Sequence, residues 1–209
     1  MEGGVDVRFD RSGKLVEAAG VDTATKVIAE LPSQREFKEH LQAQARDQIG
    51  VVLVDLDNFK AVNDSKGHPA GDACLAKVVA TVGVVIVGEG KLYRYVGEEF
   101  AVILRNADAD EAAATAERIR RAIEAAQPGG DIEVTGSIGV AASDQPGLRD
   151  PDKLLQAVDD AVYSSKNAGK NRVTKWHYEQ GRQSASLYAG PGRAGSRRLA
   201  SVFERPRST

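Results

Sequence analysis

This sequence of 209 residues has a single cysteine. It lacks an amino-terminal signal peptide pattern and a hydrophobic run long enough to span a membrane. Cys74 is the only cysteine, so no intramolecular disulfide can form, and nothing indicates an oxidising compartment. The first residues carry charges where a signal peptide would need an apolar segment. The most apolar stretch, Val78–Val87, has ten residues, about half of a membrane span. We therefore expect a soluble, cytoplasmic protein that does not contact a membrane.

Net charge is also nearly absent, because 28 Lys and Arg residues stand against 30 Asp and Glu residues. This balance excludes a uniformly basic nucleic-acid binder and a strongly acidic chain. The charge is uneven, however: residues 177–209 contain six arginines, no lysine and only Glu179 and Glu204 as acids, which gives +4 there and −6 in the rest. We expect a solvated tail that binds nucleic acid at most weakly and in a salt-sensitive way.

The chain does contain the patterns of a mixed α/β domain. Residues 49–56 form a continuous apolar run rich in β-branched residues, which is typical of a central strand buried on both faces. Ser33, with Glu36 three residues later, predicts a capped helix that ends near Gly50. Further along we expect a helix over 70–87 (a strand is the alternative for its Val-rich half), a polar loop over 63–69 before it, a hairpin of strands 91–95 and 100–104, a helix over 108–126, a strand over 132–142, a helix over 152–167 and a short strand over 173–176.

Composition divides the chain into three parts. Residues 1–24 form an amino-terminal extension, in which the alternation of Val5, Val7 and Phe9 and the later Leu15-Val16 favour a hairpin. Residues 25–176 hold the strong periodic patterns and form the main domain. Residues 177–209 are rich in Arg, Gly and Ser without apolar periodicity, so we expect a flexible tail.

The order of elements from residue 49 is β-α-β-β-α-β, a split βαβ arrangement. A right-handed crossover makes the first two strands parallel, so both end at the same edge of the sheet. Asp55 and Asp57 lie at the end of the first strand, and Glu98 and Glu99 lie in the turn after the second. We therefore expect these acidic residues to meet, although about 40 residues separate them.

Carboxylates that converge repel one another unless a cation neutralises them. Hard oxygen ligands from rigid elements suit Mg²⁺, which keeps part of its water shell and shares its coordination with phosphates. Lys60 and the polar residues 63–68 supply nearby donors for phosphate oxygens. Such a layout suits in-line attack at the phosphorus of a triphosphate. The alternative is that these acids are solvated residues at a strand end and a turn.

Five ordered segments stand out within residues 25–176. They are LPSQREF (31–37), DLDNFKAVNDSKGHPAGD (55–72), RYVGEEF (94–100), TGSIGVA (135–141) and AVYSSKNAGKNRV (161–173). Together they resemble the GGDEF family of diguanylate cyclases. The resemblance implies a palm-like nucleotidyl cyclase fold of the α/β (α+β) class, with helices around a mostly antiparallel five-stranded sheet. It also implies condensation of two GTP molecules into cyclic di-GMP across a homodimer.

The resemblance implies a metal centre and catalytic residues. Asp55 and Glu98 match the family's Mg²⁺ ligands, with Mn²⁺ as an alternative ion. Leu56 would offer its carbonyl oxygen to the metal, and Glu99 would assist. Lys60 matches the residue that stabilises charge developing on the phosphates. Lys60, Glu98 and Glu99 are therefore the expected catalytic residues.

The resemblance also implies a set of substrate-binding residues. These are Asn58, Phe59 and Lys60 around a phosphate cradle of backbone N–H groups, Asn63 and Asp72 as guanine readers, Gly97 in the signature, and Lys166 and Lys170 at the terminal phosphates. A carboxylate at Asp72 suits guanine, because it accepts from N1–H and N2–H donors that adenine lacks. Local alternatives remain: Asp72 also suits a helix start, Lys166 and Lys170 suit a helix end, and Asn63 suits a turn.

The sequence departs from the family at two places. Val96 replaces the first glycine of the signature, and a β-branched residue does not easily adopt a positive φ or leave room for a nucleotide. The family's R-x-x-D inhibition site falls on residues 87–90, VGEG, so feedback inhibition through it is not expected. We expect a diguanylate cyclase of reduced or absent activity. The alternatives are a degenerate GTP-binding module that signals to a protein partner, and a related synthase with another base preference.

Overall fold

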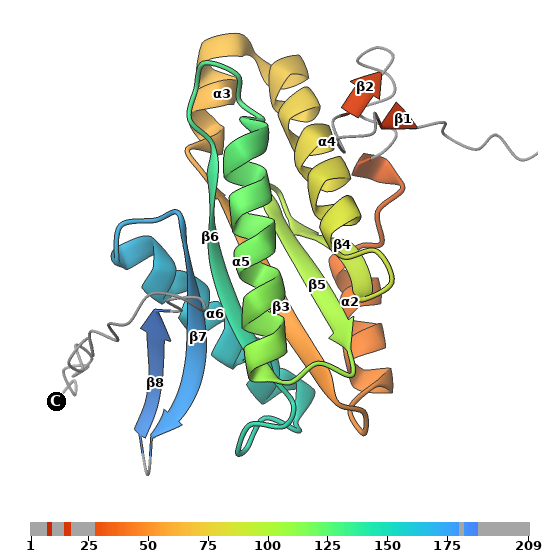
Figure 1. The fold of residues 1–209 in the computed structure, drawn as a ribbon, viewed down its shortest axis with the longest axis vertical. Coiled ribbons are helices and arrows are strands. Elements are labelled where there is room, and N and C mark those ends of the chain that lie inside the picture. The colour runs from red at the N-terminus through yellow and green to blue at the C-terminus, as the bar shows by residue number, and fades with distance from the viewer. Residues whose placement is uncertain (1–7, 10–14, 18–27, 180–181, 188–209) are drawn as a thin grey trace, which may run out of the picture.

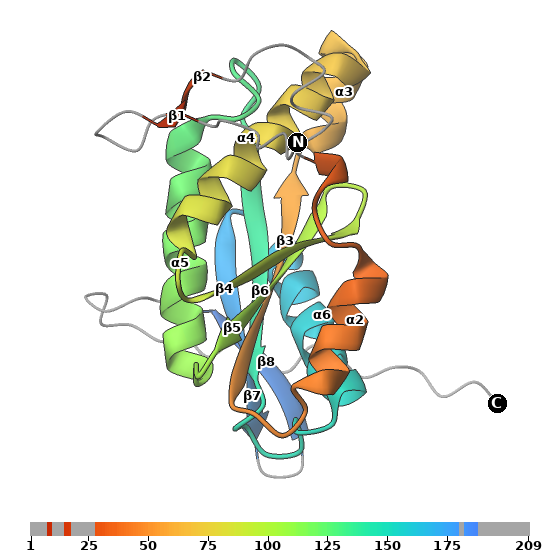
Figure 2. The same ribbon diagram turned by 90° about the vertical axis from the view of Figure 1, so that its right-hand side faces the viewer.

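The computed structural model describes residues 8–9, 15–17, 28–179 and 182–187, which include a six-stranded sheet with helices on both faces (Figures 1 and 2). The strands are β3 (Ile49–Asp57), β4 (Gly90–Val96), β5 (Glu99–Arg105), β6 (Thr135–Ala142), β7 (Arg172–Glu179) and β8 (Arg182–Leu187). The helices are α2 (Gln34–Ala43), α3 (Phe59–Lys66), α4 (His68–Val85), α5 (Ala109–Ala126) and α6 (Pro151–Asn167). The strand order is β4-β5-β3-β6-β7-β8, in which the β6–β7 pair is parallel and the other pairs are antiparallel. The expected mostly antiparallel five-stranded sheet is thereby confirmed, and β8 adds a sixth strand.

β3 is the central strand that the apolar run predicts. Every residue of β3 is buried, and the strand pairs with β5 on one side and β6 on the other. Its side chains alternate between two hydrophobic clusters: Val52 and Val54 lie in one, and Val51 and Leu53 lie in the other. A strand with partners on both edges and apolar neighbours on both faces is held rigidly, so its carboxyl end is a well-defined base for a site.

Helices cover the two faces separately (Figure 2). α4 and α5 pack on one face, where Val78 and Ile119 are among the buried residues. α2 and α6 pack on the other face, where Phe37 and Val158 are buried. The expected cap of α2 is present, because Ser33 accepts a hydrogen bond from the Glu36 N–H and the Glu36 carboxylate accepts from the Ser33 N–H.

The topology brings the end of β3 and the β4–β5 turn to one edge. β5 runs antiparallel to both β3 and β4, so β3 and β4 are parallel to each other. In the β3–β5 ladder Asp55 is directly opposite Glu99. The expected meeting of the two acidic segments is therefore confirmed for this pair.

The expectation of a polar loop over 63–69 is wrong, because helix α3 occupies Phe59–Lys66. Phe59 and Val62 supply the buried side chains of α3, and the remaining positions are polar. Gly67, with φ 81°, ends α3, and α4 begins at the next residue. A short helix and a glycine break therefore replace most of the expected loop, whereas the helix expected over 70–87 is present as α4 (His68–Val85).

The ends of the described chain also differ in part from expectation. β1 (Arg8–Phe9) pairs antiparallel with β2 (Leu15–Glu17), as the hairpin prediction requires, whereas Val5, Val7 and the turn lie outside the described residues. β8 lies inside the segment expected to be a flexible tail, so that expectation is wrong for Arg182–Leu187. β8 is held by backbone pairing with β7 and needs no apolar periodicity.

Among the described helices, none combines the length and the apolar character that crossing a bilayer would require.

Candidate active site

Two carboxylates from neighbouring strands meet where β3 ends. Asp55 is buried, and its ladder partner Glu99 is partly buried. Burial raises the pKa of Glu99 to about 7, with further contributions from the charge of Asp55 and a hydrogen bond to it. Two acids held this close cannot both ionise freely, so the position favours a cation.

Helix α6 supplies a cation to this pair. Nζ of Lys166, in the last turn of α6, lies 2.5 Å from Oδ2 of Asp55. Burial works against the charged form of Lys166, yet the hydrogen bond and the charges of Asp55 and Glu99 raise its pKa. Lys166, expected at substrate phosphates, thus contacts Asp55 of the carboxylate pair in this structure.

A glycine allows α6 to lie this close to the sheet. A Cβ at Gly139 on β6 would lie 2.3 Å from the carbonyl oxygen of Val158 and 2.5 Å from the Val162 nitrogen. The glycine therefore lets the backbone of α6 rest directly on β6. Sequence reasoning placed Gly139 in a matching motif without recognising this packing role.

The β4–β5 turn corrects the expectation for Val96. The left-handed φ of this turn belongs to Gly97, at 55°, and Val96 does not have a positive φ. Val96 ends β4 with 54% of its surface exposed, and Arg94 donates hydrogen bonds to the Gly97 carbonyl oxygen. Valine at position 96 therefore fits the backbone of the turn, and its side chain lies at the surface.

Asp57 does not join the carboxylate pair. Its two oxygens accept hydrogen bonds from the hydroxyls of Thr135 (2.8 Å) and Ser137 (2.7 Å) and from the backbone N–H of Asn171 (3.0 Å). Asp57 is 3% exposed, so three donors satisfy its charge inside the protein. The sequence-based grouping of Asp57 with Asp55, Glu98 and Glu99 is therefore wrong for Asp57.

The donor set fits a hard divalent ion. Asp55 and Glu99 converge, and Glu98 follows Gly97 in the turn without a hydrogen-bond or ion-pair partner among the described residues. No group of three or more His, Cys, Asp or Glu side chains in this part of the chain is arranged to hold a metal by itself. Two carboxylates that need neutralisation suit a hard ion that completes its coordination with water and phosphate.

The residues expected at the phosphates surround the start of α3. Asn58, with φ 62°, lies between β3 and α3, and its side chain does not cap the helix. Lys170 Nζ lies 3.0 Å from Asn58 Oδ1. Lys60 extends along α3 to Asp64 at 2.7 Å and is mostly exposed. The structure therefore brings Lys170 to this turn and places Lys60 one residue beyond Phe59, the first residue of α3.

The expected guanine readers lie on adjoining helices. Asn63 is on α3, and Asp72 is near the start of α4. Gly71 makes this possible, because a Cβ there would lie 2.0 Å from Oδ1 of Asn63. Sequence reasoning missed Gly71, although a glycine early in a helix is a visible signal of close packing.

Comparison with known proteins gives a consistent result. The family model described as "Diguanylate cyclase, GGDEF domain" matches residues 19–172. The chain is 35% identical over 163 residues to diguanylate cyclase DosC of Escherichia coli K12, covering 75% of this chain and 35% of that protein. It is 35% identical over 164 residues to diguanylate cyclase A of Treponema denticola, covering 73% and 44%. The chain thus spans less than half the length of these relatives.

Solved structures resemble the fold as well. The active GGEEF domain of a diguanylate cyclase from Vibrio cholerae superposes with a TM-score of 0.65 and 27% identity, covering 72% of this chain and 100% of that one. The GGDEF domain of DgcB from Caulobacter crescentus, solved in complex with c-di-GMP, gives a TM-score of 0.62 and 28% identity, covering 81% and 98%.

Proposed function

Because the chain belongs to the GGDEF diguanylate cyclase family, we propose that it condenses two GTP molecules into cyclic di-GMP. In each half-reaction the 3′-hydroxyl oxygen of one GTP forms a bond to the α-phosphorus of the other. The bond from that phosphorus to the bridging oxygen breaks, pyrophosphate leaves, and the hydroxyl proton goes to a base. The observation that carries the proposal is the convergence of Asp55 and Glu99 at the end of β3.

Glu99 has the properties of the proton acceptor. Without a metal its pKa is about 7, near physiological pH. A cation at the carboxylate pair would lower that pKa, so Glu99 would then be ionised and able to accept the proton. Asp55, Glu98, Glu99 and the Leu56 carbonyl would hold Mg²⁺ or Mn²⁺, as the family resemblance implies. That ion would neutralise charge on the phosphates.

The lysines and the two helices α3 and α4 would bind the substrate. Lys60, Lys166 and Lys170 supply positive charge for the triphosphate, and Lys170 already lies at the turn that contains Asn58. Backbone N–H groups near Phe59 and Gly97 would complete the phosphate contacts. Asn63 and Asp72 would read guanine, and Asp72 selects against adenine because it accepts two hydrogen bonds from guanine's donors.

Catalysis would require two copies of the chain. Each site has one set of the proposed guanine-reading residues, so two domains with bound GTP have to face each other for the hydroxyl of one to reach the phosphorus of the other. We therefore propose an active homodimer, whose assembly a regulatory protein could control.

The exposed side chain of Val96 favours a second candidate function, a GTP-binding module without turnover. It adds an isopropyl group to the β4–β5 turn at a signature position where the family has glycine. Incubation with GTP and Mg²⁺, followed by chromatography for cyclic di-GMP, tests both functions in wild type and Val96→Gly. Product from wild type supports the cyclase. Product from the glycine variant alone supports the module, and absence of GTP binding contradicts both.

A further inference from the structure

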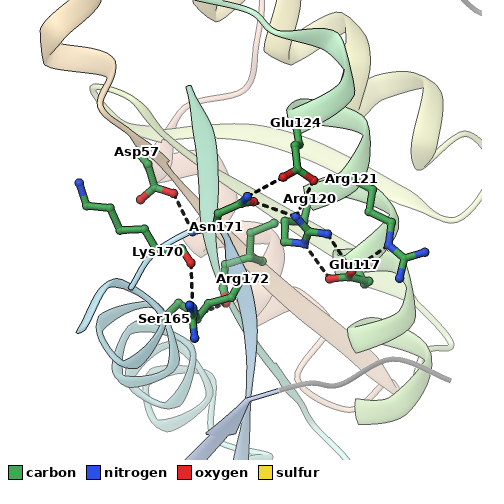
Figure 3. A network of polar contacts seen from close by, with 10 residues as sticks. Asp57, Glu117, Arg120, Arg121, Glu124, Ser165, Lys170, Asn171 and Arg172 are labelled. Atoms are coloured by element: carbon green, nitrogen blue, oxygen red, sulfur yellow. Dashed lines mark hydrogen bonds and ion pairs between the residues drawn. The ribbon is translucent and has the colours of Figure 1, made fainter. Parts of the chain in front are cut away.

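Helix α5 carries a cluster of charged side chains near the connection between α6 and β7 (Figure 3). Arg120 binds Glu117 through two contacts of 3.0 Å, and its Nη1 lies 2.9 Å from Oε2 of Glu124. The side chain of Arg120 is only 14% exposed. Charge-assisted contacts with limited access to water hold a side chain more firmly than a surface ion pair does.

Asn171 links this cluster to the end of β3. Its Oδ1 accepts a hydrogen bond from Arg120 at 2.8 Å, and its Nδ2 donates one to Glu124 at 2.7 Å. A guanidinium only donates and a carboxylate only accepts, so the orientation of the amide is determined. The backbone N–H of Asn171 donates to Asp57 on the other side (Figure 3). Asn171 is therefore anchored from two directions.

The backbone next to Asn171 needs such an anchor. Gly169, Lys170 and Asn171 have φ angles of 108°, 61° and 44°, three consecutive residues in the left-handed region. Asparagine tolerates this region, but lysine adopts it only where its surroundings impose it. In this conformation the Lys170 side chain points toward the start of α3, where Nζ contacts Asn58.

We propose that Arg120 is a positioning residue that acts through Asn171 to hold the 169–171 segment, so that Lys170 is kept in place for the substrate's phosphates. The inference rests on the proposed function, because only a phosphorylated ligand needs Lys170 there. It gives a role in substrate binding to a helix on the face of the sheet opposite to α6.

Three variants of the full chain separate positioning from folding. Arg120→Met removes the guanidinium and keeps an unbranched side chain. Asn171→Gly keeps the N–H bond to Asp57 and accepts a positive φ, so it removes only the side-chain anchor. Arg121→Met is the matched control, because Arg121 also binds Glu117 but is 66% exposed and does not contact Asn171. Urea unfolding records the stability of each variant.

The probes are 3′-deoxy-GTP, which cannot condense because it lacks the attacking hydroxyl, and 3′-deoxyguanosine, which has no phosphates. Calorimetry in Mg²⁺ measures both affinities. Lys170→Met is expected to weaken 3′-deoxy-GTP binding about fivefold to tenfold, and Arg120→Met and Asn171→Gly about threefold. None of the three should change the affinity for 3′-deoxyguanosine, and Arg121→Met should change neither affinity.

A double-mutant cycle completes the test. If Arg120 acts through Lys170, Arg120→Met has no further effect once Lys170 is Met. Equal losses for nucleotide and nucleoside, an additive effect in the double variant, or unchanged nucleotide binding in Arg120→Met would each overturn the positioning role. A wild-type protein that binds neither probe would refute the proposed function and the inference together. Wild-type binding that survives Arg120→Met refutes the inference alone.

Discussion

Nζ of Lys166 lies 2.5 Å from Oδ2 of Asp55, although the two residues are 111 positions apart in the sequence. The contact joins the last turn of α6 to the end of β3 and places one positive charge beside two carboxylates. In the protein without a metal, this ammonium offsets the repulsion between Asp55 and Glu99. A divalent ion bound at this pair, as proposed above, would therefore compete with Lys166 for the oxygen atoms of Asp55.

Replacing Lys166 should change metal and nucleotide binding in opposite directions. We expect Lys166→Met to bind Mn²⁺ alone about fivefold more tightly, because the competing cation is gone, and 3′-deoxy-GTP about fivefold more weakly. Calorimetry with each ligand checks this. Lys153→Met, on an exposed position of the same helix, is the control. Parallel losses of both affinities would argue for damage to the fold instead.

The raised pKa of Glu99 makes stability depend on pH. Glu99 titrates near 7 in the folded protein against 4.5 ordinarily, so the folded state binds its proton more tightly. The free energy of unfolding should fall as the pH rises from 4.5 through about 7. Glu99→Gln removes this titration, so its unfolding free energy relative to that of wild type should rise by about 1–3 kcal/mol between pH 4.5 and about 8. Urea unfolding of both proteins at pH 4.5 and at about pH 8 measures this change. A difference in unfolding free energy between the variant and wild type that is the same at the two pH values would contradict the prediction.

Asp55 and Asp57 lie two residues apart on β3 but should respond differently to substitution. Asp57→Ala leaves the donors of Thr135, Ser137 and Asn171 without their acceptor, and we expect a loss of about 3 kcal/mol in unfolding free energy. Asp55→Asn relieves repulsion while weakening the Lys166 contact, so stability should change by less than about 1 kcal/mol. Chemical denaturation of both variants provides the comparison, and similar losses would refute the distinction.

Gly139→Ala should displace α6. The added methyl would meet the α6 backbone, so we expect a loss of about 3 kcal/mol in unfolding free energy and weaker 3′-deoxy-GTP binding. Gly83→Ala on α4 is the control, because no atom outside the neighbouring backbone of its own helix lies within 4 Å of the added Cβ. Helix propensity should then raise the stability by up to about 1 kcal/mol. Thermal and urea unfolding distinguish the two. A Gly139→Ala protein as stable as wild type would contradict the packing role.

The central strand and the meeting of Asp55 with Glu99 could be predicted because they follow from pattern and topology. A continuous apolar run identifies β3, and the handedness of the crossover places its end beside the β4–β5 turn. Neither argument depends on the direction of any single side chain. The fold and the edge of the sheet that holds the candidate site could therefore be predicted from the sequence.

The features that the sequence did not predict, namely α3, β8 and the role of Asp57, depend on local geometry that residue types alone do not specify. α3 buries only Phe59 and Val62, too few apolar positions to reveal a helical period. β8 depends on backbone pairing rather than on an apolar face. Asp57 and Asp55 have the same side-chain chemistry. Only their different neighbours distinguish Asp57, which is hydrogen-bonded inside the protein, from Asp55, a candidate site residue.

The left-handed residue of the β4–β5 turn is Gly97, the second position of the signature, whereas Val96 continues the strand. Positions 96 and 97, which correspond to the two glycines in the family's name, are therefore under unequal constraint in this chain. The left-handed backbone at position 97 favours glycine, whereas position 96 accepts any side chain that fits at the surface. The residue at the first position of the signature can consequently vary while the β4–β5 hairpin keeps its shape.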